Sequence, residues 1–227
     1  MRFPHSRFII ITGTDTGVGK TVTTAALAVA LESRGFKVAI VKPVQTGVEA
    51  DDSGDIDEVV RLTGNTYVHE FIRLEAALAP ESAAMLELVE LPTMAELATR
   101  IRRIEADAIL IEGAGGLLVR MDLDGGTVRD LAKVLRAEVV VVGREGLGTL
   151  NHFQLTVDNL RTAIRHEPHV VIGSYADDPG FAEQSNRVDL PRITGLPIDG
   201  RIPEGAGELS RDEFRSKAPG WFTFRWQ

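Results

Sequence analysis

Short runs of almost entirely apolar residues alternate along the chain with stretches whose apolar positions recur at helical spacing. Apolar runs without a polar face predict strands covered on both sides, and their alternation with helices is typical of a parallel sheet with crossover helices. We therefore expect an α/β fold with helices on both faces of a mostly parallel sheet. The predicted strands are residues 8–12, 38–41, 108–111, 139–142 and 170–172, with 196–202 as a weaker sixth. The predicted helices are residues 20–33, 56–63, 94–104, 128–135, 151–165 and 182–190.

The length and composition fit a single domain spanning residues 1–227. With 227 residues and 44% hydrophobic content, the chain can bury a substantial core. A net charge of −8 argues against a large electrostatic footprint for nucleic acid, and no apolar run approaches the roughly 20 residues of a membrane helix. The first strand begins too early to leave room for a cleavable signal, so we expect a cytoplasmic protein. The absence of cysteine excludes disulfides, thiolate nucleophiles and thiolate metal sites.

A glycine-rich loop joins the first predicted strand to the first predicted helix. Its sequence is Gly13-Thr-Asp-Thr-Gly-Val-Gly-Lys-Thr21, with five residues rather than four between Gly13 and Gly19. In such a loop, backbone N–H groups close around phosphate oxygens and the helix N-terminus favours negative charge. Lys20 would reach the β- and γ-phosphates, and the Thr21 hydroxyl would reach a magnesium ion. A turn that only connects a strand to a helix does not explain the adjacent Lys-Thr, so we predict a phosphate-binding loop.

Polar and glycine-rich segments also follow the other predicted strands. Lys42-Pro-Val-Gln-Thr-Gly47 follows the second strand, Glu112-Gly-Ala-Gly-Gly116 follows the third, and Gly148-Thr-Leu-Asn-His152 comes soon after the fourth. In an open α/β sheet, ligands bind outside the carboxyl ends of the strands. We therefore expect these segments and the phosphate loop to form one site.

Thr21, Asp55 and Glu112 make a sensible set of oxygen ligands for Mg²⁺, which proteins hold with one or two carboxylates plus phosphates. Glu112 ends a buried strand and is hard to explain as a surface residue. Asp55 would open a helix, and the alternative for it is a cap on a solvated acidic loop. Other aspartates compete for its role: Asp51, Asp52 and Asp57.

Lys42 ends an apolar strand and is followed by Pro43. A lysine in this place can stabilise the charge that develops in phosphoryl transfer. The alternative is an amine that extends from the sheet edge into water. The histidines outside the motifs are predicted to have surface or packing roles: His5, His69, His166 and His169.

Taken together, these segments resemble dethiobiotin synthetases. The phosphate loop and residues 42–47, 112–116 and 147–152 occur in the order and spacing of that family, over residues 8–205. The resemblance implies a P-loop NTPase-like fold and the ATP-dependent closure of 7,8-diaminononanoate and CO2 into dethiobiotin, with ADP and phosphate released. It implies Mg²⁺ as cofactor, a carbamate whose oxygen attacks the γ-phosphate, and a second amine that closes the cyclic urea. It also implies a homodimer with the substrate carboxylate at its interface.

Position by position, the resemblance assigns roles to residues of this chain. The catalytic residues would be Lys42, Lys20 and Thr16, and the metal ligands would be Thr21, Asp55 and Glu112. The nucleotide contacts would be Asp15, Thr16, Gly17, Val18, Gly19, Lys20, Thr21, Glu112, Gly173, Ser174, Ile202 and Pro203. The substrate contacts would be Thr46, Gly148, Thr149, Leu150 and Asn151. Asn151 also has the residue type of a helix N-cap, and a cap without a ligand is the alternative for it.

One departure from the family concerns the nucleotide base. Adenine-specific members carry an Asn-Asp pair after the strand that corresponds to residues 170–172. This chain continues with Gly173-Ser-Tyr-Ala-Asp177 and lacks the pair. We therefore predict weaker discrimination among nucleoside triphosphates than in those members.

Other classes of ATP-using protein fit the sequence less well. A switch or partitioning ATPase would carry a signature lysine where Asp15 stands, and an amidase relative would need a nucleophilic cysteine. A simple kinase has no specific motif in its favour. The base that takes the proton of the diamine is not identified from the sequence. The aromatic residues at 220–227 are expected to pack on the body or on a partner.

Overall fold

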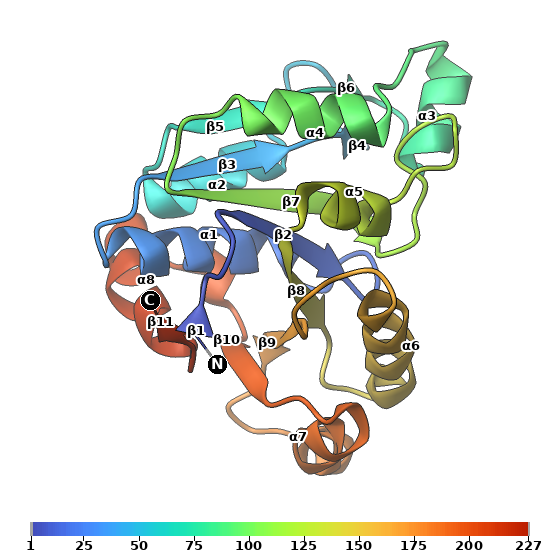
Figure 1. The fold of residues 1–227 in the computed structure, drawn as a ribbon. Coiled ribbons are helices and arrows are strands. Elements are labelled where there is room, and N and C mark those ends of the chain that lie inside the picture. Colours follow the sequence, from blue (N-terminus) through green and yellow to red (C-terminus); the bar gives the residue numbers. More distant parts are fainter. Residues whose placement is uncertain (1, 227) are drawn as a thin grey trace.

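The computed structural model describes residues 2–226, and its centre is a seven-stranded sheet in which all neighbouring strands are parallel (Figure 1). The strand order is β10-β9-β8-β2-β7-β3-β5. The strands are β2 (Phe8–Gly13), β3 (Val38–Lys42), β5 (Val68–Glu70), β7 (Ala108–Gly116), β8 (Glu138–Gly143), β9 (His169–Tyr175) and β10 (Ile198–Pro203). Two short pairs lie outside this sheet: β1 (Arg2–Phe3) with β11 (Arg225–Trp226), and β4 (Gln45–Thr46) with β6 (Arg73–Leu74).

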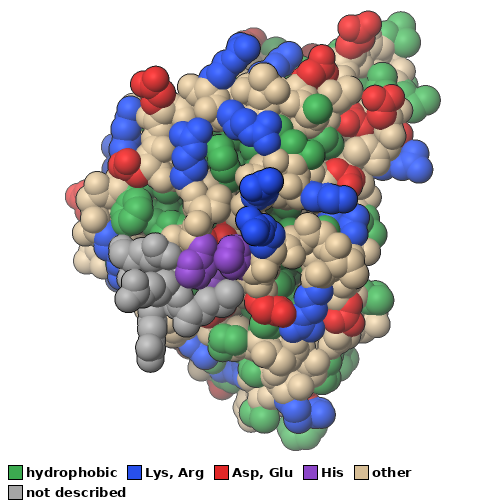
Figure 2. All heavy atoms as spheres, viewed as in Figure 1, with side chains coloured by type: hydrophobic (Ala, Val, Ile, Leu, Met, Phe, Trp, Pro, Cys, Tyr) green, Lys and Arg blue, Asp and Glu red, His purple; other side chains and the backbone are tan. Residues whose placement is uncertain are grey.

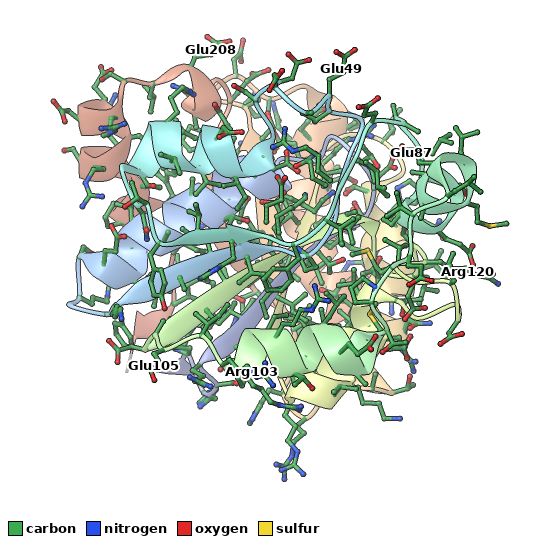
Figure 3. The ribbon with its side chains drawn as sticks, turned by 90° about the horizontal axis from the view of Figure 1, so that it is seen from above. Glu49, Glu87, Arg103, Glu105, Arg120 and Glu208 are labelled. Carbon is green, nitrogen blue, oxygen red and sulfur yellow. The ribbon has the colours of Figure 1, made fainter. Side chains whose placement is uncertain are left out.

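Helices cover both faces of the sheet, as the apolar strands predict. One core cluster contains residues of α1, α2 and α8, and the other contains residues of α3 to α7. The helices are α1 (Lys20–Glu32), α2 (Asp55–Thr63), α3 (Pro80–Glu87), α4 (Met94–Arg102), α5 (Val128–Leu135), α6 (Thr149–Arg161), α7 (Phe181–Thr194) and α8 (Arg211–Lys217). Seen from above, Glu87 of α3 and Arg120 lie toward one end of the molecule and Glu105 toward the other (Figure 3). The α/β fold with a mostly parallel sheet is therefore confirmed.

Each strand predicted from apolar runs is present, and each predicted helix has a counterpart. The edge strand β5 was not predicted, because Val68-His-Glu70 is too short and too polar to form an apolar run. The helix α3 was not predicted either, because it buries only small residues while Met85 and Leu86 are exposed. β7 also continues through Glu112 to Gly116, so Glu112 lies within the strand and does not end it.

The prediction that Asn151 caps a helix is wrong. The N-cap of α6 is Gly148, whose φ of 87° is the left-handed conformation that glycine adopts without strain. The helix therefore begins at Thr149, and Asn151 lies within its first turn with an exposed side chain.

The aromatic segment near the C-terminus packs against the body of its own chain. The backbone of β11 pairs with β1, so the two ends of the chain lie side by side (Figure 1). The ring of Phe224 stacks on Phe3 with 4.3 Å between centroids, and both rings meet the edge of His169. Residue 227 of the predicted aromatic segment lies outside the described residues.

His169, at the start of β9, lies between two carboxylates at the edge of the sheet formed by the amino ends of the strands. Its Nδ1 is 3.0 Å from Asp199 Oδ2 and its Nε2 is 3.3 Å from Glu138 Oε2. Burial by itself lowers the pKa of His169, but the hydrogen bonds and negative charges of Asp199 and Glu138 outweigh it and raise the pKa. The predicted packing role fits this histidine, which is 2% exposed.

The raised pKa of His169 predicts a pH dependence of stability. Because the folded-state pKa lies above the unfolded value of about 6.5, the stabilisation is complete below about pH 6.5 and is lost as pH rises through the folded-state pKa. Urea denaturation between pH 6 and 9 should show this fall in the free energy of unfolding, and His169→Gln should remove it. His152→Gln, at an exposed histidine of α6, should retain the wild-type slope. A wild-type slope in His169→Gln would refute the assignment.

The surface carries charges of both signs. On the face shown in Figure 2, Lys and Arg side chains alternate with acidic, apolar and uncharged groups. None of the helices within residues 2–226 combines the length and the apolar character needed to cross a bilayer.

Candidate active site

The phosphate loop has the predicted position between β2 and α1. Gly17 and Gly19 adopt φ values of 68° and 93°, and Gly19 is the N-cap of α1. Lys20 is buried and its Nζ donates to the carbonyl oxygen of Asp15 at 2.9 Å, so the amine lies over the loop. Burial lowers the pKa of Lys20, and the negative charges of Glu112 and Asp55 oppose that shift. The loop therefore combines N–H donors, a helix N-terminus and an amine, as phosphate binding requires.

The end of β9 packs directly on the phosphate loop. A Cβ atom at Gly173 would lie 1.9 Å from the carbonyl oxygen of Val18, and one at Gly19 would lie 2.5 Å from the carbonyl oxygen of Gly173. Both distances are impossible for a real side chain, so both positions require glycine. The Val18 side chain is buried in the core, which leaves its backbone to form the loop.

Lys42, Asp55, Glu112 and Thr21 meet at the centre of the site. Lys42 Nζ forms ion pairs with Glu112 Oε1 at 3.0 Å and with Asp55 Oδ2. The Thr21 hydroxyl lies 3.1 Å from Asp55 Oδ1 and 2.9 Å from Glu112 Oε1. The side chains of Lys42 and Glu112 are only 3% and 2% exposed, whereas that of Asp55 is 34% exposed. Lys42 therefore lies in the interior of the site and does not extend into water.

These charges stabilise one another. Burial alone would lower the pKa of Lys42, but Glu112 and Asp55 outweigh it and raise the pKa. Burial alone would raise the pKa of Asp55, but the charge and hydrogen bond of Lys42 outweigh it and lower the pKa. Both groups are therefore ionised near neutral pH.

Asp55 is the aspartate of the acidic loop that reaches this cluster. It begins α2, and its backbone N–H donates to Gln45 Oε1 at 3.0 Å. Asp57 instead accepts from the N–H of Gly54 at 2.8 Å, and Asp51 and Asp52 are exposed. Gln45 was not among the predicted site residues, although it lies within the segment 42–47 that the sequence placed at the site.

A cleft of about 910 Å³ opens over the cluster and the phosphate loop. Its polar wall includes Thr16, Lys20, Thr21, Lys42, Gln45, Thr46, Asp55 and Glu112. Its apolar wall includes Val48, Ala77, Leu78, Ala79, Pro80, Ala114 and Val119, which come from the loop after β4, from the start of α3 and the segment before it, and from β7 and the turn that follows it. The apolar wall was not predicted, because no pattern in the sequence connects residues 77–80 to the motifs.

Some of the residues assigned by resemblance lie outside the lining of this cleft. The Thr149 hydroxyl points inward and donates to the carbonyl oxygen of Arg144 at 2.5 Å. Asn151 is exposed at the start of α6. Ser174 is exposed at the end of β9, whereas the Ile202 side chain is fully buried, so only its backbone could contact a ligand. Asp15 is also exposed and is bonded to Arg144 at 2.9 Å.

Thr21, Asp55 and Glu112 offer oxygen atoms around one point, as a hard cation requires. Within residues 2–226, there is no cluster of three or more His, Cys, Asp or Glu side chains that could hold a metal ion. Oxygen donors of this kind suit Mg²⁺, which is usually held by few carboxylates together with phosphate oxygens.

Comparison of the sequence with known proteins shows which family the chain belongs to. A family described as an AAA domain matches residues 7–207. A protein of Rhodococcus jostii named ATP-dependent dethiobiotin synthetase BioD is 45% identical over 220 residues, which cover 96% of this chain and 95% of the relative. A protein of the same name from Streptomyces coelicolor is 47% identical, with 95% and 91% covered. The chain belongs to the dethiobiotin synthetase family. The resemblance carried by the motifs is thereby confirmed.

Solved structures support the fold assignment. The signal recognition particle receptor FtsY of Elizabethkingia anophelis matches with a TM-score of 0.53 and 19% identity, and FtsY of the Physcomitrella patens chloroplast with 0.52 and 17%. This chain spans only 65% of either structure. At this level of identity the likeness concerns the fold alone.

Proposed function

We propose that this chain closes 7,8-diaminononanoate and CO2 into dethiobiotin while it converts ATP to ADP and phosphate. The observation that carries the proposal is that Lys20 of the phosphate loop and Lys42 of the buried cluster line one cleft together with Thr21, Asp55 and Glu112. Family membership agrees with it, because the relatives are named ATP-dependent dethiobiotin synthetases.

The chemistry must bring two anions together. One amine of the substrate bonds to CO2 and loses a proton, which gives a carbamate. A carbamate oxygen then attacks the γ-phosphorus and the bond to ADP breaks, which gives a mixed carbamic–phosphoric anhydride. The second amine attacks the carbonyl carbon and loses a proton, and phosphate leaves with the oxygen that joined it. Lys20 and Lys42 would lower the repulsion between carbamate and triphosphate and hold both in position.

Mg²⁺ would be held by Thr21, Asp55 and Glu112, and it supplies positive charge to the triphosphate oxygens. With the two carboxylates bound to the metal ion, the Lys42 ammonium would interact with the carbamate. Thr16 and Thr46 lie on the polar wall, where they can orient the reacting groups.

The aliphatic chain of the diamine would lie along the apolar wall at Val48, Leu78 and Val119. Its carboxylate would bind at the start of α6, residues 148–151, contributed by a second copy in a homodimer. Exposed apolar side chains near this segment support such an interface, because Leu147 is 91% and Leu155 63% exposed. We also propose that residues 1–227 form one domain and that the protein acts in the cytoplasm.

A phosphate-release assay tests the proposed function. With ATP, Mg²⁺, bicarbonate and the diamine present, we expect phosphate and dethiobiotin in equal amounts. Omission of either bicarbonate or the diamine should abolish phosphate release. Release that continues without the diamine would remove the synthetase assignment and favour a simple ATPase.

The end of β9 predicts the nucleotide preference. Without the Asn-Asp pair, no side-chain amide and carboxylate stand at Gly173 and Ser174 to read the adenine edge. We expect kcat/KM values for ATP, CTP and GTP within about tenfold of one another, since a hydrogen bond to a base is worth roughly 1 kcal/mol. Steady-state kinetics with each nucleotide measures this. Strict selectivity for ATP would contradict it.

A further inference from the structure

Glu145 is a buried carboxylate that no step of the proposed reaction uses. It lies just beyond β8, and its side chain is 6% exposed. Oε1 accepts from the backbone N–H of Ala176 at 2.7 Å and from Arg187 Nη2 at 3.2 Å, and Oε2 accepts from Arg187 Nε at 2.9 Å. A bidentate pair of this kind is among the strongest and most directional polar contacts in proteins.

Arg187, on α7, extends this contact to the end of β9. Its Nη2 donates to the carbonyl oxygen of Ala176 at 2.6 Å, and its guanidinium carbon lies 3.6 Å from the ring centre of Tyr175. Glu145 and Arg187 thus bond both polar backbone groups of Ala176 and cover one face of Tyr175. Gly173, which packs on the phosphate loop, lies in β9 only two and three residues before Tyr175 and Ala176.

Residues 144–146, which contain Glu145, also form hydrogen bonds with the phosphate loop and with α7. The guanidinium of Arg144 donates to Asp15 Oδ2 at 2.9 Å and to the carbonyl oxygen of Thr16 at 3.4 Å, both in the phosphate loop. The Asn186 amide of α7 donates to the carbonyl oxygens of Glu145 at 2.8 Å and Gly146 at 3.0 Å. One short segment therefore joins the phosphate loop, the end of β9 and α7.

The sheet order indicates which part of a nucleotide this segment serves. Lys42 and Glu112 lie on β3 and β7, on one side of the phosphate loop, and they would face the γ-phosphate. The nucleoside must then extend to the other side of β2, over the ends of β8, β9 and β10. Tyr175 and Ala176 lie at that end.

We propose that Glu145 and Arg187 are positioning residues for the nucleotide. They fix the end of β9 beside the phosphate loop, so that the wall facing the ribose and base is formed before the nucleotide binds. A preformed wall raises affinity because no ordering is needed on binding. Buried ion pairs add little net stability compared with apolar side chains, so positioning explains why a charged pair is placed here. The identity of the nucleotide rests on the proposed function.

Binding of ATP with Mg²⁺, measured by calorimetry without the diamine, tests the inference. For Arg187→Met and Glu145→Gln we expect the dissociation constant to rise roughly ten- to hundredfold, as for the loss of hydrogen bonds to a charged group. The kcat at saturating ATP should stay within about twofold of wild type, because the reacting groups are untouched. Arg192→Gln is the matched control, since Arg192 lies on the same helix and pairs with Asp189 at the surface, with 69% of its side chain exposed. It should bind ATP normally.

Thermal unfolding separates positioning from simple stabilisation. Should the single variants fold poorly, the double variant Glu145→Leu/Arg187→Met replaces the pair by apolar side chains and should restore the melting temperature. Its dissociation constant for ATP should stay raised, because Ala176 is still unanchored. Variants with lowered melting temperature but unchanged ATP affinity would overturn the inference, as would a double variant that recovers both. Failure of the proposed function would appear separately, as wild-type phosphate release that does not need the diamine.

Discussion

Lys42→Gln is expected to lower kcat by about 10²–10³, the effect of removing one electrostatic donor from a developing anion. Lys42 is 3% exposed, and its ammonium contacts both Asp55 and Glu112. Glutamine can still donate a hydrogen bond, but it carries no charge with which to oppose the repulsion between carbamate and triphosphate. Steady-state phosphate release at saturating ATP, Mg²⁺ and diamine measures the loss.

The same substitution should also destabilise the protein without ligands. Without the ammonium, the buried carboxylate of Glu112 loses its cation, and breaking a buried ion pair costs about 3–5 kcal/mol. The lowered pKa of Asp55 should return upward, because Lys42 is the main group that holds it down. Urea denaturation measures the stability change, and Lys133→Gln, at an exposed lysine of α5, is the control. Near-normal kcat in a destabilised Lys42→Gln would assign Lys42 a structural role only.

Gly173→Ala is expected to raise the dissociation constant for ATP by roughly ten- to hundredfold, the equivalent of 1–3 kcal/mol of overpacking. The new methyl group would collide with the carbonyl oxygen of Val18, a backbone atom that cannot rotate away. The phosphate loop must therefore shift away from β9, and its N–H groups would no longer point at the phosphate oxygens. Calorimetric titration with ATP and Mg²⁺ measures this.

Gly220→Ala is the matched control for Gly173→Ala, because a Cβ there meets no heavy atom within 4 Å and the residue does not have a positive φ. It should leave ATP affinity and thermal stability unchanged. Wild-type affinity in Gly173→Ala would show that the close packing of β9 on the phosphate loop does not matter for binding.

The central part of the fold could be predicted because each strand of the sheet interior is buried on both faces. Val38–Lys42 and Glu138–Gly143 are buried along their whole length, and they contain the continuous apolar runs at residues 38–41 and 139–142. β5 at the sheet edge has intermediate exposure and therefore no such run. The start of α6 could not be predicted from residue type, because Gly148 reaches its capping conformation through backbone freedom.

The site was predictable where its residues follow strand ends. The phosphate loop, Lys42 and Glu112 are close in space because parallel strands place their carboxyl ends at one edge. Asp55 needed the structure, since its contacts with Lys42, Thr21 and Gln45 are what distinguish it from its acidic neighbours. Glu145 and Arg187 could not be predicted, because their contact joins residues 42 positions apart.

The transfer of oxygen from CO2 to phosphate tests the central claim, that carbamate and triphosphate react directly in this cleft. The reaction would be started with C¹⁸O2 and quenched before the label exchanges with water, and the products analysed by mass spectrometry. The account predicts one ¹⁸O in the released phosphate and one in the urea carbonyl of dethiobiotin. Unlabelled phosphate would mean that water cleaves the nucleotide, and it would contradict the account.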